Sequence, residues 1–207
     1  MKNKILIILT ILLLPIITFS NNIPNNSPYA VLEKSVMSIQ NDLISNPSYY
    51  QSNPANITSL LNKKLIPNLD INYIAKNVLG KIWISASESK KQIFLNDFLK
   101  MVVFLYGKNI SIAGEYELKI RPIRSAVYEN SSYVQITGIL IRQGKKQGSN
   151  ITFYMKKQYN KWKIYDVAFE GISIINNYRQ QFQSINNIND AITAVKKVSD
   201  KIKAQEN

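Results

Sequence analysis

The side chains that could do chemistry in this chain are carboxylates, tyrosines, lysines and serines, because its 207 residues include no His and no Cys. Cysteine nucleophiles, Ser-His-Asp triads, histidine acid–base catalysis and zinc sites with His or Cys ligands are therefore excluded. The strongest remaining pair is Asp166 beside Tyr165, since some isomerases use an Asp base and a Tyr donor in an apolar pocket. Neighbouring strand residues point to opposite faces, so this pair should not converge on one ligand. We predict no enzymatic activity, no cofactor and no metal.

Asp166 and Glu170 are expected to have structural roles instead. A carboxylate at the end of a strand commonly accepts hydrogen bonds from backbone N–H groups or from an arginine. Arg179 is the candidate arginine.

These residues belong to one stretch, from Trp162 to Phe182, around which the chain is organised. Residues 162–169 alternate as a strand that is apolar on nearly both faces, so cover is needed on both sides. After Glu170 and Gly171 the period changes, and a helix is predicted from the spacing of Ile172, Ile175, Tyr178, Arg179 and Phe182.

Period-two patterns predict three more strands upstream, and helical patterns predict cover for them. The strands are expected over 118–124, 133–142 and 150–159, with short turns that indicate an antiparallel meander. Helices are expected from Pro28 to about Ile44, from Pro54 to Leu65, from Asp70 to Gly80, from Ser85 or Ser87 towards Ile112, and from Asn187 onwards. The predicted fold class is α+β: a twisted four-stranded antiparallel sheet cupped by helices, whose concavity would suit an apolar ligand.

The N-terminus has the pattern of a secretory signal peptide. Lys2 and Lys4 precede an apolar run over residues 5–17, and small residues around Ser20 suit cleavage there. A membrane anchor is the alternative, although the apolar run is short for a span. We expect residues 1–20 to be a signal peptide and residues 21–207 to be a single domain. Because the domain has no Cys and therefore no disulfides, a bacterial envelope protein fits better than a small secreted animal domain.

The formal net charge of +13 favours anionic surfaces such as phospholipid head groups or an acidic partner. Export of the chain by a signal peptide argues against nucleic acid as the partner. A basic surface that is simply solvated is the default interpretation of scattered lysines.

Several fragments, in this order, resemble one family. They are Leu65-Ile66-Pro67 with Asp70, Val78-Leu79-Gly80 with Trp83, Phe94, Phe98, Leu105-Tyr106, Trp162-x-x-Tyr165-Asp166-Val167, Glu170-Gly171-Ile172-Ser173 and Tyr178-Arg179. The chain from about Pro28 to Ala204 resembles the MlaC (toluene-tolerance) family of periplasmic phospholipid-binding proteins. The resemblance implies a soluble shuttle of an ABC-type lipid transport system that maintains outer-membrane lipid asymmetry. It would carry phospholipid between an outer-membrane lipoprotein complex and the lipid-binding ring of an inner-membrane ABC transporter, and it would contact membranes through these partners.

The resemblance also implies an acyl-chain pocket between helices and sheet. The residues predicted to bind lipid are Leu79, Trp83, Phe94, Phe98, Val102, Tyr106, Phe153, Met155, Tyr165, Val167, Ile172 and Ile175. If the sheet turns its other face to the helices, Tyr154, Ile164 and Trp162 replace some of them. A basic rim for encounter with anionic membranes is expected from Lys81, Arg121, Arg124, Arg142 and Arg179.

One alternative from a different functional class stays open. The same apolar residues could fill a solid core, and the chain would then be a secreted interaction module without a ligand.

Overall fold

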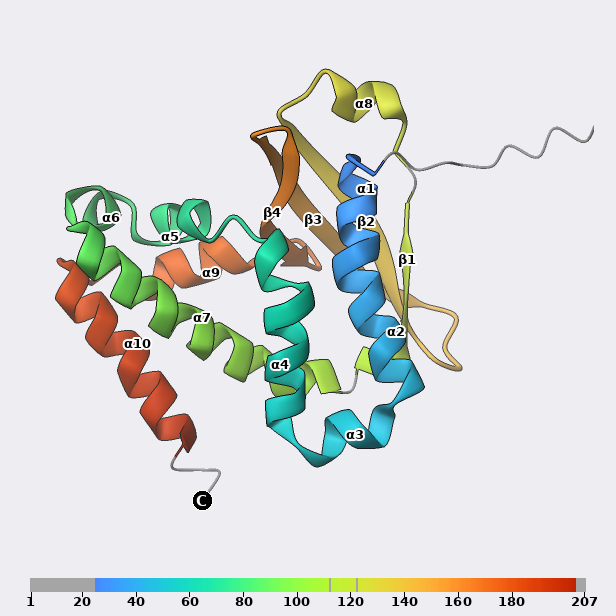
Figure 1. Ribbon diagram of the computed structural model, residues 1–207, viewed down its shortest axis with the longest axis horizontal. Coiled ribbons are helices and arrows are strands. Elements are labelled where there is room, and N and C mark those ends of the chain that lie inside the picture. Colours follow the sequence, from blue (N-terminus) through green and yellow to red (C-terminus); the bar gives the residue numbers. More distant parts are fainter. Residues whose placement is uncertain (1–24, 112, 122, 204–207) are drawn as a thin grey trace, which may run out of the picture.

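The computed structural model describes residues 25–111, 113–121 and 123–203 (Figure 1). The predicted signal peptide over residues 1–20 lies outside the described residues. Within the described ranges, no helix is both long enough and apolar enough to cross a membrane.

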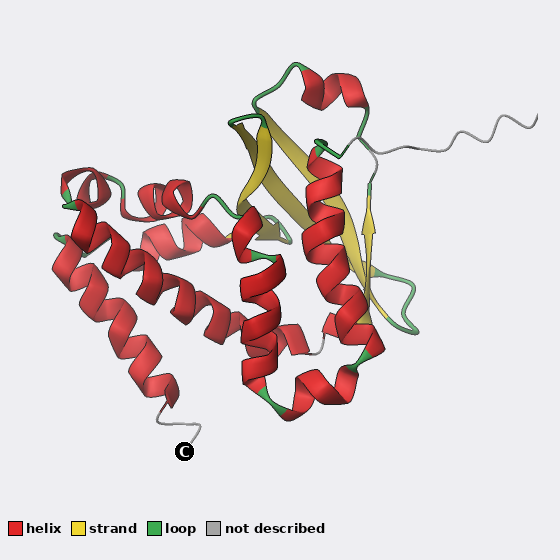
Figure 2. Ribbon diagram, viewed as in Figure 1, coloured by secondary structure: helices red, strands yellow, loops and turns green. Residues whose placement is uncertain are grey.

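The chain is an α+β protein, as predicted, in which helices precede, flank and follow an antiparallel sheet (Figures 1 and 2). The helices are α1 (Pro28–Leu32), η1 (Glu33–Met37), α2 (Ser38–Ser45), α3 (Pro47–Ser52), α4 (Pro54–Lys64), η2 (Ile66–Asn68), α5 (Ile71–Leu79), α6 (Lys81–Ser85), α7 (Glu88–Ser111), η3 (Ala113–Glu115), α8 (Ser125–Glu129), α9 (Ile174–Gln181) and α10 (Ile188–Lys203). The strands are β1 (Tyr116–Ile120), β2 (Tyr133–Arg142), β3 (Gly148–Gln158), β4 (Lys161–Phe169) and β5 (Ile172–Ser173).

Side-chain caps set several helix starts at the positions that the sequence indicates. The Asn53 side chain accepts a hydrogen bond from the Ala55 N–H at 2.9 Å at the start of α4. Asp70 accepts from the Tyr73 N–H at 3.1 Å at the start of α5, and Asn187 accepts from the Asp190 N–H at 3.0 Å before α10. These caps satisfy N–H groups that have no partner inside the helix. Gly80, with φ of 56°, ends α5 and lets the chain turn directly into α6.

The sheet has the order β1-β2-β3-β4-β5, and every neighbouring pair is antiparallel. The prediction of four strands is therefore wrong by one. The fifth strand, β5, has only two residues, and it pairs with the end of β4 through Phe169 and Ile172 before the chain enters α9. The first strand is also shifted, since the chain leaves the sheet after Ile120 and forms α8, which the sequence pattern did not indicate.

One register shift in the sheet decides which residues share a face. Between Tyr154 and Met155 of β3, the partners on β4 change from Asp166 to Ile164, so Tyr165 is an extra residue in β4. Such a bulge breaks the alternation of side chains along the strand. As a result, Ile164 and Val167 are the partners of Met155 and Phe153 on one face of β3, although they are three positions apart in sequence.

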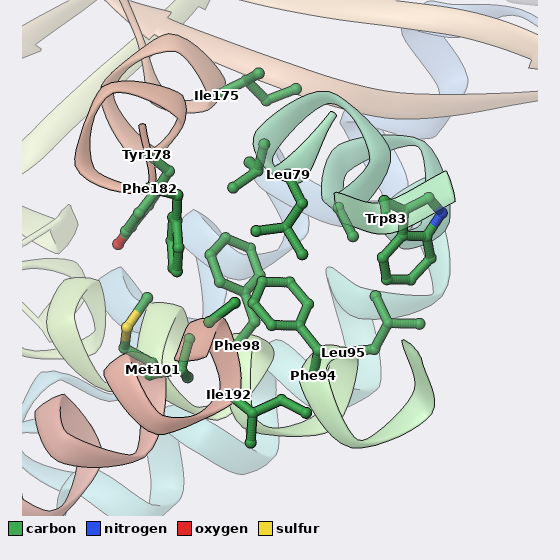
Figure 3. Packing of buried hydrophobic residues seen from close by; sticks show 14 residues of the cluster. Leu79, Trp83, Phe94, Leu95, Phe98, Met101, Ile175, Tyr178, Phe182 and Ile192 are labelled. Atoms are coloured by element: carbon green, nitrogen blue, oxygen red, sulfur yellow. The ribbon is translucent and has the colours of Figure 1, made fainter. Parts of the chain in front are cut away.

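Among the described residues, the apolar interior consists of three clusters. The sheet cluster lies between α1 and one face of the sheet, and includes Leu32, Val134, Ile136, Phe153, Met155, Trp162 and Ile164. A smaller cluster joins α2, α4 and α7. The helical cluster is formed by α5, α6, α7, α9 and α10, a layer that lies beside the sheet (Figures 1 and 3).

The helical cluster is densely aromatic. The rings of Phe94 and Phe98 stack with centroids 5.3 Å apart, and Phe98 meets Tyr178 edge to face at 5.1 Å (Figure 3). Phe182 contacts both phenylalanines, and Trp83 closes the far side against Phe94. Offset and edge-to-face pairs of this kind add to the stabilisation from burial alone.

Candidate functional site: an apolar cavity between helices and sheet

A cavity of about 250 Å³ lies where the helical cluster meets the sheet cluster. Its helical wall comes mainly from α5, α7 and α9, and its other wall comes from β3 and β4. The lining residues are Val36, Leu65, Leu69, Ile71, Ile74, Val78, Phe98, Leu99, Val102, Phe153, Ile164, Tyr165, Asp166, Val167, Ile174, Ile175 and Tyr178. The surface of this cavity is almost wholly apolar. It is suited to hydrocarbon and offers little to a polar ligand.

Asp166 is the one carboxylate among the described residues of the lining, and its oxygens face the start of α9. Oδ1 accepts hydrogen bonds from the backbone N–H groups of Val167 at 2.8 Å and Ile175 at 3.1 Å, and Oδ2 accepts from the Ser173 hydroxyl. The Ser173 oxygen in turn accepts from the Asn176 N–H at 3.0 Å. The two side chains together cap α9, which is the structural role expected for Asp166.

The arginine expected for this carboxylate lies elsewhere. Arg179 donates through Nε to the carbonyl oxygen of Asn77 at 2.8 Å, in the last turn of α5. The proposed pairing of Arg179 with Asp166 or Glu170 is therefore wrong. Glu170 instead accepts a hydrogen bond from the backbone N–H of Asn150 at 2.8 Å. Backbone donors satisfy these carboxylates because the β4–β5 turn brings them close to neighbouring chain segments.

Tyr165 lies on the cavity wall together with Asp166, which corrects the expectation that the pair would point to opposite faces. The bulge at Tyr165 is the reason, because strict alternation does not hold there. The Tyr165 ring also contacts Tyr73, Tyr133 and Tyr154, at centroid distances of 5.1, 6.1 and 6.2 Å. Burial raises the pKa of the Tyr165 phenol above its ordinary value, and the neighbouring Tyr73 and Asp166 raise it further.

Six of the residues predicted to bind lipid line this cavity: Phe98, Val102, Phe153, Tyr165, Val167 and Ile175. Leu79, Trp83 and Phe94 belong to the helical cluster and do not line the cavity. Leu79 ends α5, Trp83 lies in α6, and the Phe94 ring packs against Trp83 and Phe182. Met155 is fully buried in the sheet cluster. Ile172 is 70% exposed on β5, and the side chain of Tyr106 lies outside the described residues.

The sequence pattern missed much of the helical wall. Ile71, Ile74 and Val78 form the apolar stripe of α5, and their spacing is visible in the sequence, but nothing in the pattern says that this stripe faces a cavity. Ile164 belongs to the set that was predicted for the opposite sheet face. It lines the cavity together with Val167 because the bulge brings both to the same face.

The expected basic rim does not form one cluster around this cavity. Arg142 pairs with Glu115 at 2.8 Å, and Arg179 lies in a separate, open recess with Tyr73, Lys76, Asn77, Gly80 and Ile84. Lys81, Arg121 and Arg124 are exposed or half-exposed on other elements.

The fold and the site together define an α+β protein that encloses an apolar cavity between a helical layer and an antiparallel sheet. The family model described as MlaC protein matches residues 33–202, so the chain belongs to the MlaC family.

Two curated relatives match most of the chain. The intermembrane phospholipid transport system binding protein MlaC of Haemophilus influenzae is 20% identical over 171 residues, which are 81% of this chain and 78% of that protein. The toluene tolerance protein ttg2D of Pseudomonas putida is 22% identical over 157 residues, which are 75% of this chain and 71% of that protein.

A solved structure has the same fold. The phospholipid-binding protein from Ralstonia solanacearum, in complex with a phospholipid, superposes with a TM-score of 0.76 at 16% identity, over 84% of this chain and 97% of that one.

Proposed function

We propose that the chain is a periplasmic phospholipid carrier, and that it holds acyl chains in the cavity between α5, α7, α9 and the sheet. The observation that carries this proposal is the almost wholly apolar lining at the boundary of two hydrophobic clusters. The proposal is supported by two relatives, described as a phospholipid transport binding protein and a toluene tolerance protein, and by a phospholipid-binding protein of the same fold. The mature carrier would be the single domain over residues 21–207, exported by the signal peptide over residues 1–20.

The physical basis of binding is the transfer of hydrocarbon out of water. Each buried CH₂ group stabilises the complex by roughly 0.8 kcal/mol, so a long acyl chain binds tightly without any polar anchor. Burying an unpaired phosphate would oppose binding, and the head group therefore stays outside the cavity. Since the cavity of about 250 Å³ is slightly smaller than the roughly 300–1,000 Å³ of typical ligand pockets, we expect it to widen on binding.

Binding without catalysis fits the groups on the cavity wall. The carboxylate of Asp166 is engaged by backbone donors and by Ser173, and the raised pKa of Tyr165 keeps its phenol neutral at ordinary pH. Neither group is poised to accept a proton from a ligand. The cavity wall therefore holds hydrocarbon rather than assisting a reaction.

Our proposal includes the transport partners. A carrier of an intermembrane system must receive phospholipid from one membrane complex and deliver it to another. We propose an outer-membrane lipoprotein complex and the lipid-binding ring of an inner-membrane ABC transporter in these roles.

Uptake from vesicles tests the function. The chain from residue 21 is stripped of lipid, incubated with vesicles of phosphatidylethanolamine and phosphatidylglycerol, and separated from them by flotation. Bound lipid is then extracted and its phosphorus is measured against protein. We expect about one phospholipid per chain. Protein that folds but takes up no phospholipid would contradict the proposal and favour the alternative, an interaction module with a solid core.

A further inference from the structure

The turn between β3 and β4 carries an aromatic side chain where the backbone disfavours one. Tyr159 and Asn160 have φ values of 46° and 61°, the left-handed conformation required by a two-residue hairpin turn with the right twist. Asn and Gly adopt this conformation readily, whereas a bulky side chain there is unfavourable. The Tyr159 side chain is 93% exposed, so no packing offsets this cost. A contact outside the chain would account for a tyrosine at this position.

The strands beside this turn are strongly basic. Residues 156–164 include Lys156, Lys157, Lys161 and Lys163 and no acidic residue. Lys156 pairs with Asp70 at 3.2 Å, and Lys163 donates to the Pro67 carbonyl oxygen. Among the described residues, no ion pair involves Lys157 or Lys161. Lys161 is exposed and Lys157 is half-buried, and these two cations beside the exposed tyrosine have no carboxylate among the described residues to neutralise them.

The helix α8 lies at the same end of the sheet as the turn between β3 and β4 (Figure 1). The backbone N–H of Lys157 donates to the Ser132 carbonyl oxygen at 2.8 Å, which joins the hairpin to the segment that follows α8. Arg124 at the start of α8 is exposed, Val127 is 54% exposed and Tyr133 is 52% exposed. We call the surface formed by Arg124, Val127, Tyr133, Lys157, Tyr159 and Lys161 the basic tip. Glu129 is the acidic residue of α8.

The hairpin presents Tyr159 on a rigid base. Trp162, 2% exposed in the sheet cluster, is fixed by packing against the core, and the Lys157 ammonium lies 5.9 Å from the centroid of its ring. A two-residue turn gives the tip little freedom. The side chain is thus held away from the core by a stiff element.

We propose that the basic tip docks the protein directly on an anionic phospholipid bilayer. Tyrosine rings favour the boundary between head groups and acyl chains, and lysine and arginine favour the negative surface around it. A small protruding contact suits a fluid surface, whereas a protein partner typically buries about 800 Å² on each side. This docking goes beyond the carrier function, and it does not depend on whether the cavity holds lipid.

Co-sedimentation with vesicles tests the proposal. The chain from residue 21 is mixed with vesicles of phosphatidylcholine alone or with about one third phosphatidylglycerol, at low and at high salt. We expect binding to the anionic vesicles only, and loss of that binding at about 0.5 M salt, where charges are screened within a few ångströms.

Three variants locate the contact. The double variant Lys157→Glu/Lys161→Glu should lower the partition coefficient at least tenfold, since each cation near a membrane contributes about fivefold. The matched control Lys145→Glu/Lys146→Glu makes the same charge change in the exposed turn between β2 and β3, at the other end of the sheet, and should retain most binding. Tyr159→Asn suits the turn conformation, so it should fold normally while it lowers partitioning severalfold.

Equal losses for the two double variants would overturn the proposal, because net charge rather than the tip would then drive binding. The proposal would also be overturned if Tyr159→Asn and Lys157→Glu/Lys161→Glu each had the same partition coefficient as the wild type. Failure of the docking proposal is distinguished from failure of the carrier function by a separate measurement, the amount of phospholipid that can be extracted from the protein. We expect the tip variants to retain about one extracted phospholipid per chain when they are loaded from detergent-solubilised lipid.

Discussion

The carboxylate of Asp166 accepts a hydrogen bond from the backbone N–H of Ile175 at 3.1 Å, and this contact joins the last long strand to the first turn of α9. Ile175 in turn lines the cavity and belongs to the helical cluster. The position of the helical wall relative to the sheet therefore depends on a polar contact at the edge of an apolar site.

Loss of this cap should destabilise the fold. Asp166→Ala removes the acceptor for two backbone N–H groups and for Ser173, and we expect it to lower the free energy of unfolding by about 1–3 kcal/mol. Asp166→Asn keeps an acceptor oxygen and should cost less than Asp166→Ala. Urea unfolding followed by tryptophan fluorescence measures both. Equal stability of Asp166→Ala and wild type would contradict the capping role.

Filling the cavity should block lipid binding and leave the fold intact. Val102→Trp places a large ring against the cavity from α7, and we expect extracted phospholipid to fall at least fivefold. Lys100→Trp, an exposed position on the same helix, is the control and should bind as wild type does. Full lipid loading of a folded Val102→Trp protein would place the acyl chains elsewhere.

Substitution of two leucines distinguishes a residue of the packed core from a residue of the cavity wall. Leu79, 5% exposed in the helical cluster, does not line the cavity, whereas Leu99 does. Leu79→Ala should lower the free energy of unfolding by about 2–5 kcal/mol, and its folded fraction should still bind lipid. Leu99→Ala should cost less, because its side chain borders the cavity and is only half-buried. A larger loss for Leu99→Ala would contradict the assignment of Leu79 to the packed core and of Leu99 to the cavity wall.

The raised pKa of Tyr165 predicts an alkaline effect on stability. The unfolded phenol ionises near its ordinary pKa of about 10, whereas burial keeps the folded phenol protonated to higher pH. The unfolded state then binds fewer protons, so stability is fully present below pH 10 and falls as the pH rises above it. Comparison with Tyr165→Phe at pH 8 and at about pH 10.5 isolates this group from the lysines. The wild type should lose stability relative to the variant, and a constant difference would argue against the burial effect.

The sequence indicated the fold well, because its main signals are local. Alternating strands with short turns allow little besides a meander, and Asn53, Asp70 and Asn187 are caps that act within three residues. The two-residue strand β5 was missed because two residues carry no period. The pairing of Phe169 with Ile172 depends on the conformation of the turn between them, which the sequence pattern does not give.

The cavity was harder to predict, because its walls depend on contacts between distant elements. One extra residue at Tyr165 places Ile164 and Val167 on the same face of the sheet, and no sequence pattern indicates this bulge. Phe94 and Phe98 are both phenylalanines and lie one turn apart on the same apolar stripe of α7. Both belong to the helical cluster, but Phe94 packs against Trp83 and Phe182, whereas Phe98 also lines the cavity.

Native mass spectrometry of the chain from residue 21, purified gently without detergent, tests the carrier function most directly. We predict one adduct of phospholipid mass per chain, and extraction of the same sample identifies its acyl chains and head group. Val102→Trp should give the bare mass in the same experiment. A bare mass for the wild-type chain, with no adduct after incubation with vesicles, would contradict the proposal that this cavity carries phospholipid.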